Sequence, residues 1–386
     1  MPSATRTGGT ASNGQARNTG RGHLPRMDVD GSLAVMTSRA FTELVRVQHP
    51  IVLGPFGGLS SVELTATVSD GGGLGSFGLC GYDADRIRAT GAALRARTDR
   101  PFALNLWLPL AGETDPTPTG AEFERYLEPL RGYFDELGLA LPDRPDHYLP
   151  DVADQLAATL EVEPAVISVV YGIPGPELIG AAHERGIVVI GTATTVEEAV
   201  ALNNAGVDGI VASGAEAGGH RVSFLRAPEE SLVGLFALLP QVVDAVDVPV
   251  IAAGGIADAR GVRAAVELGA DAAQIGTAFL ATRQSAASEA HRAALRGPDA
   301  AHTVLTRALS GRLARGIPNR VTRELTDPAP FPVQNWLTGQ FRPTAAARGH
   351  TELLSLWAGQ AAALATETDA AALLRALVED LDRPVR

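Results

Sequence analysis

The sequence predicts an α/β protein built as a (β/α)8 TIM barrel, with a smaller, mainly helical domain formed by an insertion and the C-terminal region. Short, continuously apolar segments alternate with amphipathic ones from residue 50 onward. Continuous apolar strands are typical of a parallel sheet that is covered on both faces. Glycine-rich sequences follow strand after strand. This favours a closed barrel over a doubly wound open sheet, where they gather at one switch point.

The pattern yields eight strands with helices between most of them. The expected strands cover residues 50–55, 73–78, 101–109, 165–172, 187–193, 207–214, 248–255 and 271–280. The expected helices cover residues 63–72, 83–99, 176–186, 194–206 and 258–269. Thr195 and Glu198 have the spacing of a capping box, which places the start of the helix over 194–206.

The expected domains follow from where this alternation begins and fails. Residues 1–38 are rich in Gly, Ser, Thr, Asn and Arg, which predicts a disordered tail, with a basic transit peptide as the alternative. The three methionines, Met1, Met27 and Met36, leave three candidate translation starts. We expect the barrel over 39–285, an insertion at about 110–160 over one of its mouths, and a helical region over 286–386 that closes the active-site side.

Composition excludes several classes of function. A formal charge of −12 without a basic face argues against nucleic acid as a partner. The single cysteine, Cys80, excludes an internal disulfide and a cysteine-based zinc site, and we expect no metal. No apolar run approaches about 18 residues and no signal peptide is visible, so we expect a cytoplasmic protein without a membrane span. A homodimer is an option that the sequence leaves open.

Two strand ends have the residues of an anion site. In AAGGIAD (252–258), Gly254 and Gly255 precede a helix that Asp258 is placed to cap. The bare backbone N–H groups and the helix dipole favour an anion there. In QIGT (274–277), Gly276 and Thr277 add an N–H group and a hydroxyl. Because the last two strands of such barrels recurrently bind phosphate, we expect a phosphate at this place.

The remaining strand ends favour a flat ring beside that phosphate. Asn105 and Gln274 are polar residues in otherwise apolar strands and need a polar partner. GPFGG (54–58), which includes Gly54, Pro55 and Phe56, removes side chains near the barrel mouth. Flavin mononucleotide (FMN) satisfies all of these features, with its phosphate at the last two strands and its ring across the mouth.

The stretch VASGAEAGGHR (211–221) presents one histidine, His220, beside Gly218 and Gly219. It follows a strand end, on the same rim as the expected flavin. Neutral imidazole takes up a proton near neutral pH, so we expect His220 to be catalytic. For Glu216 and Arg221 we expect solvated or structural roles. For three other histidines we expect no chemical role: His183, His291 and His302.

These motifs together resemble the nitronate monooxygenases, formerly called 2-nitropropane dioxygenases. The resemblance runs from about residue 40 to LWAGQAAALA (356–365). It is carried by GPFGGLSSVELTATVSDGGGLGSFG, PFALNLWLP, GVDGIVASGAEAGGHR, PVIAAGGIADARGVRAAVELGADAAQIGTAFLAT and SGRLARGIPNR. The combination of EAGGH, AAGGIAD and QIGTAF is specific, since the three together are hard to obtain by chance.

The resemblance implies an FMN-bearing barrel in which His220 is the base. The implied flavin contacts are Asn105, Gly218, Gly255, Gln274, Ile275, Gly276 and Thr277. Two positions depart from the family. Ser213 stands where many members have glutamine, and GPF (54–56) stands where many relatives have APM, so Phe56 shapes the pocket differently.

The implied reaction is oxidation of an alkyl nitronate by FMN and O2 to a carbonyl compound and nitrite. His220 would remove the α-proton of a neutral nitroalkane, or in its protonated form would stabilise the nitro oxygens of the nitronate. The sequence leaves both roles open. The alternatives are a flavin-dependent enoyl-acyl-carrier-protein reductase, an NAD(P)H:quinone reductase on the same scaffold, and, in another class, a non-catalytic flavin-binding sensor.

Overall fold

The computed structural model describes residues 39–110, 113, 116–379 and 381, and the predicted tail over 1–38 lies outside them. Its main sheet has eight parallel strands in the order β1-β9-β8-β6-β5-β4-β3-β2. A further parallel bridge, between Val52 and Leu74, joins the edge strands and closes the predicted barrel. The strands are β1 (Ile51–Leu53), β2 (Gly75–Gly78), β3 (Phe102–Trp107), β4 (Val166–Val170), β5 (Val188–Ala193), β6 (Gly209–Ser213), β8 (Val250–Ala253) and β9 (Ala272–Ile275).

Eight helices pack around these strands. They are α2 (Val62–Asp70), α3 (Ala84–Arg97), α6 (Val152–Val162), α7 (Pro176–His183), α8 (Val196–Ala205), α9 (Leu235–Ala245), α10 (Ala259–Glu267) and α15 (Ala370–Val378). The last comes from the end of the chain and contacts both α10 and α2, so it fills the place of the eighth barrel helix. Asp258 caps α10 as predicted, accepting hydrogen bonds from the N–H groups of Arg260 and Gly261.

The helix α8 begins after Thr195, whose hydroxyl accepts a hydrogen bond from the Glu198 N–H. In a capping box the Glu198 carboxylate would accept from the Thr195 N–H, but here it binds other backbone groups. It accepts from the backbone of Thr194 (2.7 Å) and from the N–H groups of Phe224 (2.6 Å) and Leu225 (3.1 Å). This buried carboxylate therefore ties the chain after β5 to the loop that follows His220.

The interior of the barrel is filled at one end by apolar side chains. The helix α1 (Arg39–Val45) contributes Phe41 and Val45 to this core. The strands contribute Val52, Ala103, Val166, Ile190, Val211, Ile251, Ala253 and Ala272, and Leu74 joins them from the position before β2. Most of these residues lie in the first half of their strands, so the carboxyl ends of the strands remain available for a site, as in other barrels.

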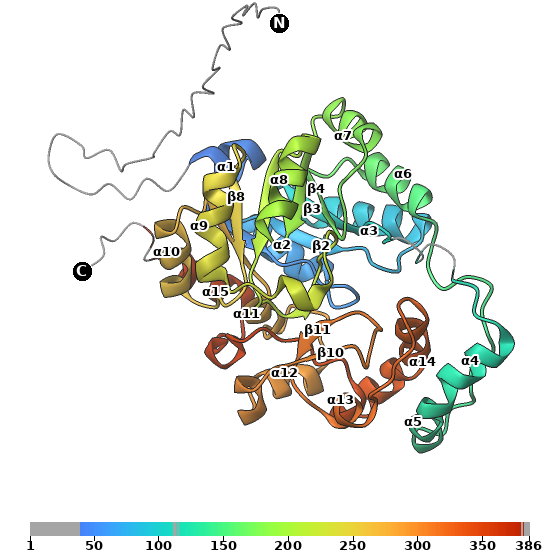
Figure 1. The fold of residues 1–386 in the computed structure, drawn as a ribbon. Coiled ribbons are helices and arrows are strands. Elements are labelled where there is room, and N and C mark those ends of the chain that lie inside the picture. Colours follow the sequence, from blue (N-terminus) through green and yellow to red (C-terminus); the bar gives the residue numbers. More distant parts are fainter. Residues whose placement is uncertain (1–38, 111–112, 114–115, 380, 382–386) are drawn as a thin grey trace, which may run out of the picture. The chain divides into compact units, whose positions relative to one another are not determined.

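The segment between β3 and β4 packs on the C-terminal helices. It contains α4 (Gly120–Leu127), the 3-10 helix η1 (Glu128–Leu130) and α5 (Arg131–Glu136), before α6 joins the barrel. The Phe134 ring meets the Phe341 ring edge to face at 5.5 Å, and Phe123 lies 6.3 Å from Trp336. Both partners belong to α14 (Val333–Ala347), which lies beside α4 and α5 in Figure 1.

The chain beyond β9 holds short helices and a small antiparallel sheet. The helices are α11 (Thr277–Leu280), α12 (Glu289–Leu295), α13 (Arg320–Glu324) and α14, with 3-10 turns at Pro298–Ala301, Thr351–Leu353 and Ala362–Leu364 and one earlier at Pro228–Ser231. The sheet pairs β10 (Val304–Thr306), β11 (Ala314–Gly316) and β7 (Gly219–His220). Among the described residues, no helix combines the length and hydropathy that crossing a bilayer requires.

One predicted strand is wrong in its second half. The expected strand over 271–280 ends at Ile275, and Thr277–Leu280 forms the helix α11. Gly276, with φ −100° and ψ −77°, turns the chain out of the extended conformation between them. The apolar run continues through the turn, and hydrophobicity alone does not separate a buried strand from a buried helical turn.

Candidate functional site

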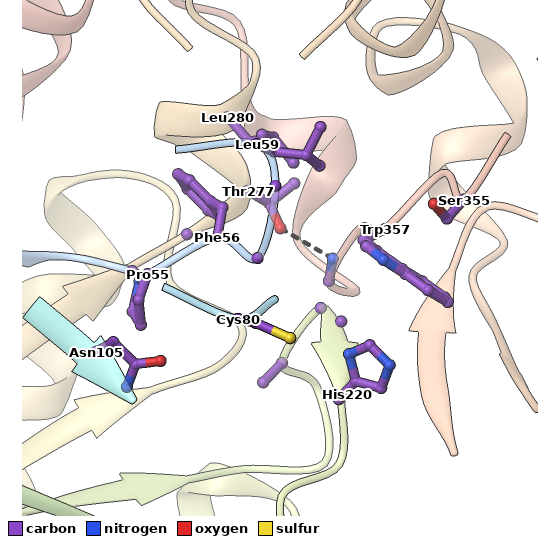
Figure 2. Close-up of a pocket in the computed structure, with 18 of the residues that line it drawn as sticks. Pro55, Phe56, Leu59, Cys80, Asn105, His220, Thr277, Leu280, Ser355 and Trp357 are labelled. Carbon is purple, nitrogen blue, oxygen red and sulfur yellow. Dashed lines mark hydrogen bonds between the residues drawn. The ribbon is translucent and has the colours of Figure 1, made fainter. Parts of the chain in front are cut away.

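A cavity of about 600 Å³ opens at the carboxyl ends of the barrel strands. This volume lies within the range of about 300–1,000 Å³ that is usual for small-molecule and cofactor sites. Strand ends and the loops after them form one wall, and residues of α14 and of the segment 354–361 form another. Figure 2 shows side chains from both walls turned toward the same space.

Glycines line the cavity where two backbones approach each other closely. A Cβ atom on Gly54 would lie 2.9 Å from the Gly276 Cα, and one on Gly218 would lie 2.4 Å from the Gly359 backbone nitrogen. Gly254 has φ +109°, and a Cβ there would lie 3.1 Å from the Ala217 nitrogen. Only glycine fits these positions without displacing the chain, so the cavity wall here is bare backbone.

The ends of β8 and β9 present backbone N–H groups to the cavity. Within the described part of the chain, the N–H groups of Gly255, Gly276 and Thr277 have no backbone acceptor. The Thr277 hydroxyl accepts a hydrogen bond of 2.9 Å from the Gly359 N–H (Figure 2), and its own proton stays available as a donor. This arrangement suits an anion such as a phosphate.

Polar side chains form the floor of the cavity. The Asn105 amide donates to the Ser168 hydroxyl (3.0 Å) and carbonyl (3.3 Å). Its oxygen points away from β3 toward the side where Cys80 lies (Figure 2). Gln274 and the buried Ser213 line the same floor. Burial raises the pKa of the Cys80 thiol to about 11, so this thiol stays protonated at neutral pH.

His220 is held by a sheet and by two aromatic rings. Its strand β7 pairs with β11, placing His220 opposite Ala314. The imidazole lies 4.9 Å from the Trp107 ring and 5.2 Å from the Trp357 ring. Its Nε2 is 2.8 Å from the Ser310 hydroxyl, which also lies 3.2 Å from the Arg312 carbonyl. When Ser310 donates to that carbonyl, Nε2 donates to Ser310 and Nδ1 carries the lone pair.

The electrostatic surroundings keep this imidazole neutral. Burial, together with the positive charges of Arg312 and Arg342, lowers the pKa of His220 to about 3. At neutral pH the ring is therefore a free base, and it does not supply a positive charge. Of the two roles that the sequence left open, proton removal requires this neutral form, and stabilisation of the nitro oxygens requires the protonated one.

Arg221 and Glu216 hold the loop that presents His220. The buried Arg221 guanidinium donates to the carbonyls of Ser213 (2.7 Å) and Gly214 (2.9 Å), as well as to the carbonyl groups of Thr194 and Ser231. The Glu216 carboxylate accepts from the Leu235 N–H at the start of α9. Both residues have structural roles, because their polar atoms are engaged with the backbone.

The fold and the geometry of this cavity agree with the comparison to known families. Residues 38–380 match the family described as nitronate monooxygenase. The chain is a member of the nitronate monooxygenase family. This confirms the resemblance seen in the sequence and makes the chain an oxidoreductase.

Individual members of the nitronate monooxygenase family are similar over nearly the whole chain. A nitronate monooxygenase from Pseudomonas aeruginosa is 43% identical over 354 residues, covering 90% of this chain and 99% of the relative. The structure of a nitroalkane oxidase from Streptomyces ansochromogenes has a TM-score of 0.79 and 38% identity, covering 89% of this chain and 97% of that one. FabK from Thermotoga maritima follows at a TM-score of 0.68 and 27% identity, covering 88% and 94%.

The structure of this nitronate monooxygenase family member brings nearly all predicted site residues to one cavity. Those that line it are Gly54, Pro55, Phe56, Asn105, Ser213, Gly218, His220, Gly254, Gly255, Gln274, Gly276 and Thr277. Ile275 does not line it. Its side chain is fully buried in the core around the barrel, and its carbonyl accepts a hydrogen bond of 2.9 Å from the Gly54 N–H.

The sequence did not predict the second wall of the cavity in this nitronate monooxygenase family member, which α14 and the segment 354–361 form. Arg342, Ser355, Trp357 and Gly359 all line the cavity. The spacing of Asn335, Gly339, Arg342, Pro343 and Ala346 on one helical face was a usable signal, because glycine and proline are rare inside helices. Within the described residues, no cluster of three or more His, Cys, Asp or Glu is arranged to hold a metal ion.

His291 makes stability depend on pH in this nitronate monooxygenase family member. It is 3% exposed, its Nε2 lies 3.1 Å from the Trp357 carbonyl, and burial lowers its pKa to about 4 from an ordinary value of 6.5. Since the unfolded chain binds the proton more tightly, stability is full above about pH 6.5 and is lost as the pH falls toward 4. We expect the drop in melting temperature between pH 7 and pH 5 to be smaller in His291→Gln. An equal drop in both proteins would contradict this.

Proposed function

We propose that the protein is an FMN-dependent nitronate monooxygenase that oxidises alkyl nitronates with O2 to a carbonyl compound and nitrite. The observation that carries the proposal is a neutral imidazole, His220, in the same cavity as a set of unpaired backbone donors at the ends of β8 and β9. The names of the relatives support it, since they include a nitronate monooxygenase and a nitroalkane oxidase.

The residues of the cavity fit FMN. Its phosphate would be held by the N–H groups of Gly255, Gly276 and Thr277, which lack backbone acceptors among the described residues. Its ring would lie against the floor and the bare backbone, formed by Gly54, Pro55, Phe56, Asn105, Ser213, Gly218, Gly254 and Gln274. Ile275 would support this site through its backbone only. When bound, FMN supplies the electron acceptor that nitronate oxidation requires.

The chain itself would handle the substrate proton. With Nε2 donating to Ser310, the Nδ1 lone pair of His220 takes the α-proton of a neutral nitroalkane. Trp107 and Trp357 pack against the imidazole from two sides and limit its rotation. A substrate that arrives as the nitronate has already lost this proton and does not need the base.

The proposal is tested by the visible absorption spectrum of the purified protein and by two assays. We expect a flavin band, and oxygen uptake that depends on propionate 3-nitronate. Rapid bleaching of the flavin by NADH without nitronate-dependent oxygen uptake would instead identify a reductase of the enoyl-acyl-carrier-protein or quinone type. Bound flavin without turnover in either assay would identify a sensor. A colourless protein that does not bind added FMN would contradict the proposal.

A cytoplasmic location and a homodimer stay predictions, as do the disordered tail and the division of the chain at residue 285.

A further inference from the structure

One wall of the cavity is a single face of α14. Asn335, Gly339, Arg342, Pro343 and Ala346 line the cavity at helical spacing, and only Arg342 among them is charged. The wall around it is open. A Cβ on Gly339 would have no neighbour closer than the Arg342 Nη2 at 3.5 Å, and Pro343 has no N–H to bond the Gly339 carbonyl. Arg342 is half-buried and lines the cavity from this face of the helix.

The guanidinium of Arg342 meets neutral acceptors only. Nη1 donates to the Ser355 hydroxyl at 3.0 Å, and Nη2 donates to the carbonyl (3.1 Å) and the side-chain oxygen (3.0 Å) of Asn335. Nε has no acceptor. Among the described residues, no carboxylate forms an ion pair with it or acts on its charge.

The other arginine whose charge acts on His220 is different. Arg312 is buried and forms an ion pair with Glu113, with Nε 2.9 Å from the carboxylate. Glu216 is the carboxylate that lines the cavity, and both of its oxygens lie 2.9 Å from the Leu235 N–H. Neither acidic group balances Arg342, so the cavity wall carries an uncompensated positive charge.

A half-buried charge without a counter-charge costs free energy unless a ligand offsets it. Burial lowers the pKa of Arg342 to about 10, so the group stays charged at neutral pH. It also lies near the imidazole. Arg342 bonds Ser355, two residues before Trp357, whose ring is 5.2 Å from the His220 ring. Figure 2 shows Ser355, Trp357 and His220 along this side of the cavity.

We propose that Arg342 binds the negative charge of the substrate, so that the cavity selects a nitronate, or a carboxylate attached to it, over a neutral molecule of equal size. Both groups carry one negative charge on a planar pair of oxygens, which suits a guanidinium. The inference rests on the proposed function, because it assigns the substrate of that reaction to this cavity.

Butyrate and butyramide test the charge directly. Butyrate has the size, planar oxygens and charge of propyl 1-nitronate but is not oxidised in the same way, whereas butyramide is its neutral counterpart. We expect butyrate to compete with propyl 1-nitronate, and Arg342→Gln to weaken this inhibition about tenfold or more, as for a charge-assisted hydrogen bond. Arg342→Lys should keep part of it. Butyramide inhibition should be equal in all variants.

Arg348→Gln is the matched control, since Arg348 ends the same helix, is exposed and donates to the Leu137 carbonyl. It should leave butyrate inhibition unchanged. KM values separate the two sources of charge. If Arg342→Gln raises the KM for both propyl 1-nitronate and propionate 3-nitronate, Arg342 binds the nitronate group. If it raises the KM for propionate 3-nitronate only, Arg342 binds the carboxylate of that substrate.

The proposal is overturned if butyrate and butyramide bind the native protein equally. It is also overturned if Arg342→Gln, with native melting temperature and flavin content, binds butyrate as the native protein does. Should no nitronate be turned over, the proposed function fails, but butyrate binding is still measured through the fluorescence of Trp107 and Trp357, which both line the cavity. The two failures are therefore distinguishable.

Discussion

Replacing His220 by alanine is expected to leave the bound flavin in place and to lower turnover of neutral nitroalkanes on the order of 10² or more, the usual contribution of a general base. The imidazole is held between Trp107 and Trp357 and is kept unprotonated by its surroundings, so its lone pair is available to accept the α-proton. Steady-state kinetics with 1-nitropropane and with its nitronate measure the effect.

The nitronate is the internal control of this experiment, because it has no α-proton to lose and should retain much more activity in the variant. His183→Ala removes an imidazole that lies on α7 and pairs with Asp208 at 2.9 Å, outside the cavity, and should change neither rate. Full nitroalkane turnover in His220→Ala would show that the base is another group. An equal loss on both substrates would indicate that His220 acts on the nitronate itself.

Introducing a carboxylate with Gly255→Asp should weaken FMN binding on the order of 10²-fold, because like charges placed against each other cost several kcal/mol. Gly255 has φ +70° and an N–H group without a backbone acceptor among the described residues, and a Cβ there would lie 3.5 Å from Glu216. The flavin absorbance of the purified variant and its titration with FMN measure this loss.

Strain at a positive φ is a separate cost, and the chain offers a matched control for it. Gly186 has φ +68° and open space where a Cβ would be. Gly186→Asp therefore carries a similar backbone penalty without a carboxylate in the cavity, and it should retain FMN. Normal flavin content in Gly255→Asp would contradict the phosphate assignment, and equal losses in the two variants would attribute the effect to the backbone.

The barrel was predictable because its signals are local. Most strands are short apolar runs that end at or just before a glycine or a polar residue, and Thr195 and Asp258 mark helix starts through hydrogen bonds within one turn. The strand ends also determine the floor of the cavity, since parallel strands bring Asn105 and Gln274 to the same rim. Residues up to about 280 could therefore be assigned to the site without knowledge of packing.

The second wall was not predictable in the same way. Arg342 and Trp357 join the cavity of His220 from more than 100 residues along the chain, and the placement of Arg342 depends on how α14 packs against Phe123 and Tyr133 of the insertion. The pairing of His220 with β11 is also a long-range contact, two residues long on the His220 side, with no periodicity to indicate it. Such contacts follow from the tertiary fold.

The backbone of His220 is hydrogen-bonded to β11, a strand outside the barrel. An isolated barrel cut after residue 285 would keep every strand of the cylinder, yet it would lose the partner that orients its own reactive side chain. Chimaeras that combine barrels of different relatives should therefore exchange residues 219–220 and 314–316 together. The orientation of His220 depends on its pairing with this strand from the C-terminal region.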